Sequence, residues 1–515
     1  MASLVHNHDV LDMITRMLSP QQAIPFSSSS RDFHAAARKH AFSSINLENG
    51  ITGASRLIKM YQSLLKSMDN RTIWPRKLEV DASILRPDLY GPLRIRRRFE
   101  QLSLDALIGI LKNAYDLEVL YLDGCEDVFE RDQRIAECVV TLPNIAELRL
   151  GGMGRASVDV LDRMISRPKM LWLYFGRVTP SQMLHATRAA VLDHVEELVV
   201  DGFHLVHREA QREVDSRRRL GKSYPSLRKL TLIGCTVYPF LDLFLDIRWL
   251  RALQCRFPED VDEVSDNDSP DDQPAHAGFS SQRPLQLEHV STLSDDAEHI
   301  PAPPSNSLEL VLLSEPVFPS EGLSDKVSGA VLLRLWLQGR EVMSCSSLTR
   351  MVSSGPSRVR YLILRMDSQS SMTRWMAKLP TTLVSSQLIC MRVETEVETP
   401  DGTLSEDSED SEDESDKEDS PNSAWPDLLR RMETVHVSAI PSLRFFSVLC
   451  DVRRSSYTGG LVCSKLTWGR VERDGDSRVV KPISNVVGEC IHRYLQSPEF
   501  CKTLQFDEDA ALRYA

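Results

Sequence analysis

The chain of 515 residues lacks several features that mark common classes of protein. No stretch approaches the ~18 consecutive apolar residues of a transmembrane helix, so we expect no membrane span. The first thirty residues have no basic start followed by an apolar run, so we expect no signal peptide. The ten cysteines form no C-x-x-C pair. This pattern favours reduced thiols in an intracellular protein of the cytoplasm or nucleus.

Motifs for catalysis, cofactors and metals are also scarce. There is no G-x-S-x-G sequence for a nucleophile elbow. Gly221–Ser223 resembles the end of a phosphate-binding loop, but Ser216 stands where the first glycine is required. His204 and His207 have no further ligands at a spacing that suits a metal. The sequence therefore predicts that the protein is not an enzyme and binds no cofactor or metal.

Two acidic segments account for the net charge of −12. Residues 258–274 carry eight acidic and no basic residues, and residues 394–419 carry fourteen acidic residues and one lysine. Without them the charge is +9. Like charges at this density keep a segment solvated, so we expect disordered insertions at 258–306 and 395–422. The arginine runs at 94–98 and 217–219 have no interleaved aromatic residues, which disfavours nucleic acid as a partner.

The second acidic segment contains candidate phosphorylation sites. Ser411 and Ser415 each have an acidic residue three positions further on, a spacing that suits acidophilic kinases. Phosphates would add negative charge to an already extended segment. The alternative is an unmodified solubilising spacer.

One apolar spacing recurs along the chain. Residues 117–125 read Leu-Glu-Val-Leu-Tyr-Leu-Asp-Gly-Cys, with leucines at positions 0, +3 and +5 and a cysteine at +8, and residues 227–235 nearly repeat this. This skeleton is the strand-and-turn half of a leucine-rich repeat. Each such unit buries its apolar face only by stacking on its neighbours. The sequence therefore predicts an α/β leucine-rich-repeat solenoid, a curved parallel sheet with helical returns, in which Cys125 and Cys235 are buried and structural.

The skeleton divides the rest of the chain into blocks. In the first block, residues 48–257, strands are expected to start at Pro75, Phe99, Leu117, Ile145, Met170, Val195, Leu227 and Leu250. In the second block, residues 307–394, they are expected to start at Leu308, Leu332, Val359 and Leu388. In residues 423–515 we expect irregular terminal repeats from Met432, Cys463 and Cys501, with a C-terminal cap. Helical returns are clearest at 105–112 and 158–165, and a helix at 483–495 should precede the last strand.

The N-terminal 47 residues have a different pattern. Residues 9–18 predict an amphipathic helix that ends at Ser19-Pro20, and residues 31–42 predict a second helix. The order of helix, Leu18-Ser-Pro break, helix from Ser-Arg-x-Phe33, and Phe42-x-x-Ile-x-Leu47 resembles the F-box of fungal F-box proteins. An F-box joined to leucine-rich repeats is a common architecture in that family. The alternative is that these helices only cap the N-terminal end of the solenoid.

This resemblance implies a substrate-recognition adaptor of an SCF-type (Skp–cullin–F-box) ubiquitin ligase. Residues 1–47 would form the F-box-like domain that docks on the Skp-family adaptor of the cullin ligase complex, and the repeats would hold an unidentified protein substrate. The residues implied in adaptor docking are Val10, Leu11, Ile14, Met17, Leu18, Pro20 and Phe33. Substrate contacts are expected at outward strand positions such as Glu118, Val119, Tyr121, Arg228, Lys229 and Thr231. The alternative function is a leucine-rich-repeat interaction scaffold unrelated to ubiquitin ligation.

Overall fold

The computed structural model divides into two compact units. Unit 1 comprises Met1–Asp246 and Cys255–Asp268, and unit 2 comprises Ile247–Gln254 and Ser269–Ala515. The structure describes residues 43–47, 51–66, 75–85, 93–176, 189–203, 226–235, 247–253, 287–293, 305–312, 321–337, 357–366, 386–399, 437–454, 461–475 and 477–514, and the single positions 13, 14, 18, 22, 40, 185, 186, 224, 255, 383 and 384.

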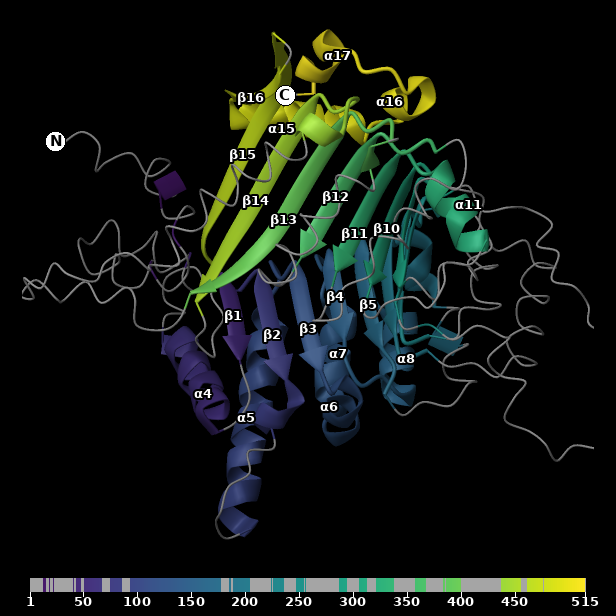
Figure 1. Ribbon diagram of the computed structural model, residues 1–515. Helices are drawn as coiled ribbons and strands as arrows, with labels where there is room; N and C mark the ends of the chain where they lie inside the picture. The colour runs from purple at the N-terminus through teal and green to yellow at the C-terminus, as the bar shows by residue number, and fades with distance from the viewer. Residues whose placement is uncertain are drawn as a thin grey trace, which may run out of the picture. The chain divides into compact units, whose positions relative to one another are not determined.

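The described part of unit 1 is built on parallel strands that neighbour one another in chain order (Figure 1). They are β1 (Ser44–Leu47), β2 (Lys77–Asp81), β3 (Val119–Asp123), β4 (Glu147–Leu150), β5 (Met170–Tyr174), β6 (Glu197–Asp201) and β7 (Lys229–Ile233). This arrangement is α/β with a mostly parallel open sheet, and it is compatible with the predicted solenoid.

The leucine spacing follows from the register of these strands. One row of paired residues runs from β3 to β7, and each member is at most 2% exposed; it consists of Leu120, Leu148, Leu171, Leu198 and Leu230. A second buried row lies two residues further along each strand, from Leu122 to Leu232. Because alternate residues of a strand face opposite sides, the +3 and +5 positions share one buried face.

A tight turn follows several of the strands. A glycine at position +7 of the skeleton has a positive φ after β3, β4, β6 and β7, at Gly124, Gly152, Gly202 and Gly234. Cys125, which comes next after Gly124, is fully buried, with its Sγ 3.1 Å from Ser157 Oγ, and burial raises its pKa to about 12.

The corresponding Cys235 is also fully buried and donates from Sγ to Val200 O at 3.3 Å. Burial raises its pKa to about 11. Because reactivity requires an exposed thiolate, both thiols act as core groups, as their position in the skeleton predicts.

Helices connect the strands of unit 1. They are α4 (Ile51–Lys66), α5 (Leu93–Asn113), α6 (Cys125–Arg131), α7 (Gln133–Thr141) and α8 (Arg155–Arg163), with short 3-10 helices η1 (Ala82–Leu85) and η2 (Ala190–His194). The helical return expected at 105–112 is thus confirmed as part of α5, and the one expected at 158–165 is confirmed up to Arg163, where α8 ends. No helix within the described residues is long and apolar enough to cross a bilayer.

The strand expected to start at Phe99 is wrong, because this residue lies inside α5. The spacing Phe99/Leu102/Leu104 imitates the skeleton, but Leu102 is 46% exposed. Buried residues of α5 instead recur at helical spacing, as at Leu104 and Leu111. The close packing of α4 on α5 also requires a glycine, since a Cβ at Gly109 would lie 2.2 Å from the ring of Tyr61.

The described part of unit 2 begins with parallel strands in chain order and ends in antiparallel ones. The parallel strands are β8 (Trp249–Leu253), β9 (His289–Leu293), β10 (Ser307–Leu312), β11 (Leu332–Leu337), β12 (Tyr361–Met366), β13 (Cys390–Thr399) and β14 (Phe445–Arg454). Strands β15 (Leu461–Asp474) and β16 (Ser477–Ile483) follow antiparallel. The helices are α11 (Glu321–Gly329), α15 (Asn485–Leu495), α16 (Pro498–Thr503) and α17 (Glu508–Leu512).

Several sequence predictions for unit 2 need correction. Strand β9 lies within 258–306, and β13 extends into 395–422, although both segments were expected to be disordered; the rest of these acidic stretches lies outside the described residues. Cys463 lies in antiparallel β15, and Cys501 lies in α16. The strand expected from Met432 lies outside the described residues, whereas β14 was not predicted.

Four predicted strand starts are displaced by two or three residues. The pairings place the skeleton's first position at Pro168, Ile247, Ser305 and Ala330, in place of Met170, Leu250, Leu308 and Leu332. The reason is visible in residues 170–175, Met-Leu-Trp-Leu-Tyr-Phe, because an unbroken apolar run fits more than one register. The starts at Val359 and Leu388 agree with the pairings, and the helix expected at 483–495 is confirmed as α15.

The turn glycines allow a test of the skeleton. We expect Gly234→Ala to lower the free energy of unfolding by about 1 kcal/mol, because an alanine there must adopt a positive φ but meets no atom within 4 Å. Gly202→Ala should cost at least about 2 kcal/mol, because its Cβ would also lie 2.7 Å from Phe175 O. Urea unfolding of the full chain compares the two, and equal losses would contradict the close approach at Gly202.

Candidate functional site

The strand face of unit 1 opposite the leucine rows carries half-buried polar and aromatic side chains. Tyr121, Arg149 and Trp172 pair across β3, β4 and β5, and the Arg149 guanidinium lies 5.0 Å from the centroid of the Trp172 ring. Arg149 Nε also donates to Glu147 Oε1 at 2.6 Å. Such a mixture of aromatic and arginine side chains is typical of protein-binding surfaces.

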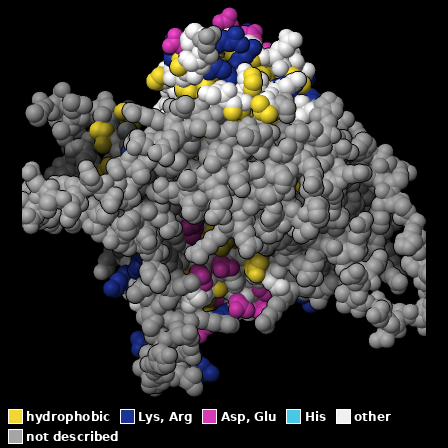
Figure 2. All heavy atoms as spheres, in the orientation of Figure 1, with side chains coloured by type: hydrophobic (Ala, Val, Ile, Leu, Met, Phe, Trp, Pro, Cys, Tyr) yellow, Lys and Arg dark blue, Asp and Glu magenta, His cyan; other side chains and the backbone are white. Residues whose placement is uncertain are grey.

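Aspartates mark the ends of several of these strands. Asp81 and Asp123 are register partners, and Asp201 occupies the corresponding position on β6. Burial, followed by the charges of Asp123 and Asp81, raises the pKa of Tyr121, and burial raises the pKa of Asp201. Figure 2 shows Asp and Glu side chains below the middle of the view, in the region where β2, β3 and β4 are drawn in Figure 1.

Four of the six residues expected to contact a substrate lie at outward strand positions, as the sequence predicts. Val119, Tyr121 and Thr231 are half-buried on this face, and Lys229 is exposed there, with its Nζ 3.4 Å from Glu197 Oε2. Two further predicted positions, Glu118 and Arg228, are exposed just before β3 and β7.

In unit 2 the equivalent face is covered by the C-terminal helices. Figure 1 shows α15, α16 and α17 beside the starts of the later strands of this unit. One core cluster joins strand residues that face away from the leucine rows to residues of these helices. It includes Leu332, Tyr361, Ile363, Cys390, Phe445, Trp468, Ile491, Tyr494, Leu495, Phe500 and Cys501.

Local sequence sets the start of each C-terminal helix. The side chains of Ser484, Ser497 and Asp507 accept hydrogen bonds from backbone N–H groups in the first turns of α15, α16 and α17. Gly488 lets α15 approach β15, because a Cβ there would lie 2.1 Å from the indole of Trp468. These features hold the helices against the strands.

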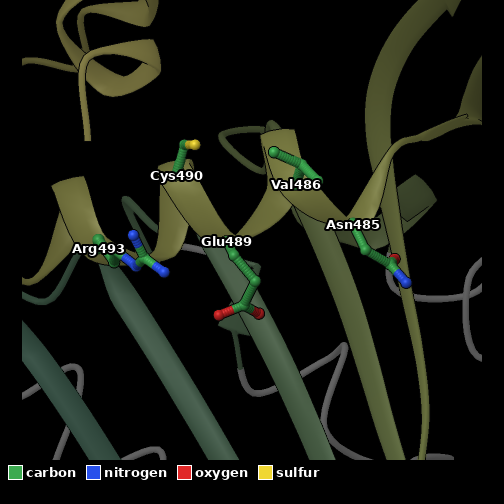
Figure 3. A pocket seen from close by; sticks show the side chains of 5 residues that line it. All are labelled: Asn485, Val486, Glu489, Cys490 and Arg493. Carbon is green, nitrogen blue, oxygen red and sulfur yellow. The ribbon is translucent and has the colours of Figure 1, made fainter. Parts of the chain in front are cut away.

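A buried ionic cluster joins α15 to the strands. The Arg392 side chain of β13 is only 9% exposed, with Nε 2.9 Å from Glu394 Oε1. Its Nη1 donates to Glu489 Oε1 at 3.1 Å, and Trp468 Nε1 donates to the same oxygen at 3.4 Å. In Figure 3, Glu489 and Cys490 point to different sides of α15. Glu489 therefore connects the helix to two strands.

A histidine on α15 completes this contact. The hydroxyl of Tyr361 on β12 is hydrogen-bonded to Nδ1 of His492 at 2.6 Å. Burial, followed by the nearby charges of Arg392, Arg334 and Arg493, lowers the pKa of His492 to about 3. The imidazole is thus neutral near pH 7, with one ring nitrogen that donates and one that accepts a hydrogen bond.

Polar pairs also lie on the earlier strands of unit 2. Arg334 of β11 donates to Glu309 of β10 at 3.2 Å, and the rings of Trp249 and His289 are 4.5 Å apart. Nδ1 of His289 lies 2.8 Å from Ser307 Oγ, and burial lowers the pKa of His289 to about 4. These strands thus offer ion-pairing and stacking groups.

The described side chains include buried thiols and the lining of a cavity on α15. Burial raises the pKa of the thiols of Cys125, Cys235 and Cys390, which keeps them protonated. Within the described residues, no three His, Cys, Asp or Glu side chains gather where they could hold a metal ion. A cavity of about 300 Å³ on α15 is lined by Asn485, Val486, Glu489, Cys490 and Arg493 (Figure 3). It offers one carboxylate and one guanidinium.

Only two of the residues implied in adaptor docking lie in the described part of the chain. Ile14 is helical and 37% exposed, and Leu18 O accepts a hydrogen bond from His40 Nε2 at 2.7 Å. The others, Val10, Leu11, Met17, Pro20 and Phe33, lie outside the described residues, as do the candidate phosphorylation sites Ser411 and Ser415.

The sequence interpretation missed the C-terminal helices as a cover for the strand face. The strand sequences contain the pattern that indicates such a cover. Leu332, Tyr361, Ile363 and Phe445 are apolar at positions that would face outward in a sheet with one buried face. Strands buried on both faces are apolar at both sets of alternate positions.

Known protein families and curated proteins supply no guide to the function. Comparison of the sequence with family models and with curated proteins gives no match to either. Function is therefore inferred from the residues and their geometry.

The ionic cluster around Arg392 predicts that removing this arginine destabilises the protein more than removing an exposed lysine. Arg392→Ala should lower the free energy of unfolding by about 2 kcal/mol, because it leaves two half-buried carboxylates, Glu394 and Glu489, without their cation. Lys481→Ala, which removes a 2.7 Å ion pair with Glu472 at an exposed position, should change it by less than about 1 kcal/mol. Chemical denaturation of the full chain measures both; a small loss for Arg392→Ala would contradict the cluster.

The neutral His492 predicts a pH dependence. Its pKa falls from 6.5 to about 3 on folding, so the unfolded chain takes up the proton first as the pH drops. Stability from this group is therefore full above about pH 6.5 and is lost as the pH falls toward 3, by about 2 kcal/mol at pH 5.

His492→Gln should accordingly lose less stability than the unsubstituted protein between pH 7 and pH 5. His194→Gln, at an exposed position of unit 1, is the control and should keep the full dependence. Urea midpoints at the two pH values measure the difference, and parallel losses for all three proteins would show that His492 does not titrate as described.

Proposed function

We propose that the protein is a substrate-recognition adaptor of an SCF-type ubiquitin ligase. An F-box-like domain in residues 1–47 would dock on a Skp-family adaptor, and a leucine-rich-repeat solenoid would bind a protein substrate. The observation that carries this proposal is the series of parallel strands, in chain order, whose leucines pair in register. It follows an N-terminal segment that resembles an F-box.

Several features support the leucine-rich-repeat assignment. The skeleton's first positions at Leu117, Ile145, Pro168, Val195 and Leu227 are 28, 23, 27 and 32 residues apart, close to the repeat length of this class. The +7 glycines and the buried side chains at +8 recur from repeat to repeat within unit 1. A cytosolic or nuclear location agrees with the buried free thiols.

The strand face of unit 1 is the proposed substrate-binding surface. Its residues Tyr121, Trp172 and Arg149 are the kinds of side chain that dominate binding energy at protein interfaces. The protein would perform no bond chemistry itself. It would raise the effective concentration of the substrate near the ligase.

The N-terminal domain is supported by one contact as well as by sequence. The 2.7 Å hydrogen bond from His40 Nε2 to Leu18 O joins the end of the first predicted helix to the second. This contact agrees with two helices that pack into one small domain. Ile14, exposed on the first helix, would contact the adaptor.

Co-purification of a Skp-family adaptor tests the proposal. The full chain should retain the adaptor, and deletion of residues 1–47 should abolish retention. Ile14→Asp should weaken retention at least about tenfold, because it buries a charge in an apolar interface. Val486→Asp, which changes a 70% exposed side chain on α15, is the matched control and should retain the adaptor fully.

Two results would contradict the proposal. The intact, folded protein could fail to retain the adaptor, or the deletion could leave retention unchanged. Either result would favour the second candidate function, an interaction scaffold that uses the strand face of unit 1 without a ligase.

A further inference from the structure

A second cavity, of about 410 Å³, lies at the starts of β13 and β14 and beside the β15–β16 hairpin. Four arginines line it: Arg360, Arg444, Arg473 and Arg478. The cavity is therefore strongly cationic.

Two of these arginines are fixed in place by hydrogen bonds to uncharged acceptors. Arg478 donates to the backbone carbonyls of Val437, Ile440 and Leu443, and Arg360 donates to Gln387 Oε1 at 2.5 Å. These bonds orient the guanidinium groups but leave their charge uncompensated. Burial, followed by the neighbouring cation Arg473, lowers the pKa of Arg478, and burial with Arg358 does the same for Arg360.

The nearby carboxylate does not neutralise the cavity. Glu472 is part of the lining, but its Oε2 lies 2.7 Å from Nζ of Lys481. Within the described residues, none of the four arginines forms an ion pair with a carboxylate. Arg444 and Arg473 are exposed, with guanidinium groups that are available to a ligand.

We propose that this cavity binds a phosphoryl group. Four cations around one cavity repel one another, and an anion between them relieves that repulsion. Guanidinium groups match the oxygens of a phosphoryl group through paired N–H donors. A phosphoryl group brings nearly two charges and three acceptor oxygens, whereas a carboxylate brings one charge and two oxygens. This site is independent of the proposed ligase function.

Isothermal titration of the full chain with inorganic pyrophosphate tests the site. The unsubstituted protein should bind the probe, and Arg444→Gln/Arg473→Gln should bind it at least about tenfold more weakly, because two charge-assisted contacts are lost. The control is Lys502→Gln/Arg513→Gln, which removes the same charge from exposed positions outside the cavity. It should bind pyrophosphate as the unsubstituted protein does.

Two outcomes would overturn the proposal. The unsubstituted protein could fail to bind pyrophosphate, or the control could lose as much affinity as the cavity variant, which would indicate general charge attraction. Circular dichroism checks that both variants are folded. A competition experiment on the unsubstituted protein tests the site without any substitution.

That competition distinguishes two sources of the phosphoryl group. A peptide with the sequence of residues 405–419, phosphorylated at Ser411 and Ser415, is compared with its unphosphorylated form as a competitor of pyrophosphate. Displacement by the phosphorylated form alone assigns the site to a phosphorylated polypeptide. Displacement by neither, with pyrophosphate bound, assigns it to a small phosphate compound. Equal displacement by both forms would overturn the proposal, because the cavity would then bind carboxylates equally well.

Discussion

The shared register of the parallel strands is the constraint on which the structure depends. A strand in these units has hydrogen-bonding groups on both edges and leucines on one face, and it satisfies them only against its neighbours. The leucines at +3 and +5 can form continuous rows only if each strand begins at the same level as the last. The +7 glycines serve this requirement, because a left-handed turn lets the chain leave each strand in the same way.

The two units use the second face of their strands differently. In unit 1 this face remains half-buried and carries Tyr121, Arg149 and Trp172. In unit 2 the helix α15 lies on it, with Glu489 and His492 bonded to Arg392, Trp468 and Tyr361. One architecture thus yields a half-buried polar and aromatic surface in one unit and a closed core with a cationic cavity at its edge in the other.

The sequence predicts the parallel α/β class, the structural cysteines and most strands of unit 1, because alternation between apolar and polar residues is clear there. It misplaces β11, whose residues Leu332–Leu337 are apolar at nearly every position, since burial on both faces removes the alternation that sets the register. The outward residues Tyr121 and Thr231 follow from the same periodicity. The contact of Glu489 with Arg392 could not be predicted, because the two residues are 97 positions apart.

Strand β16 forms an edge of the sheet of unit 2 and carries a proline and charged residues. It pairs with β15 on one side, and it contains Pro482, which has no N–H to donate, together with Arg478 and Lys481. Proline and charge on a terminal strand hinder the addition of a further strand from another molecule. A sheet whose edge strand is free to pair can add strands from other molecules and grow into fibres. The proline and charges of β16 oppose such growth at the C-terminal edge of the sheet.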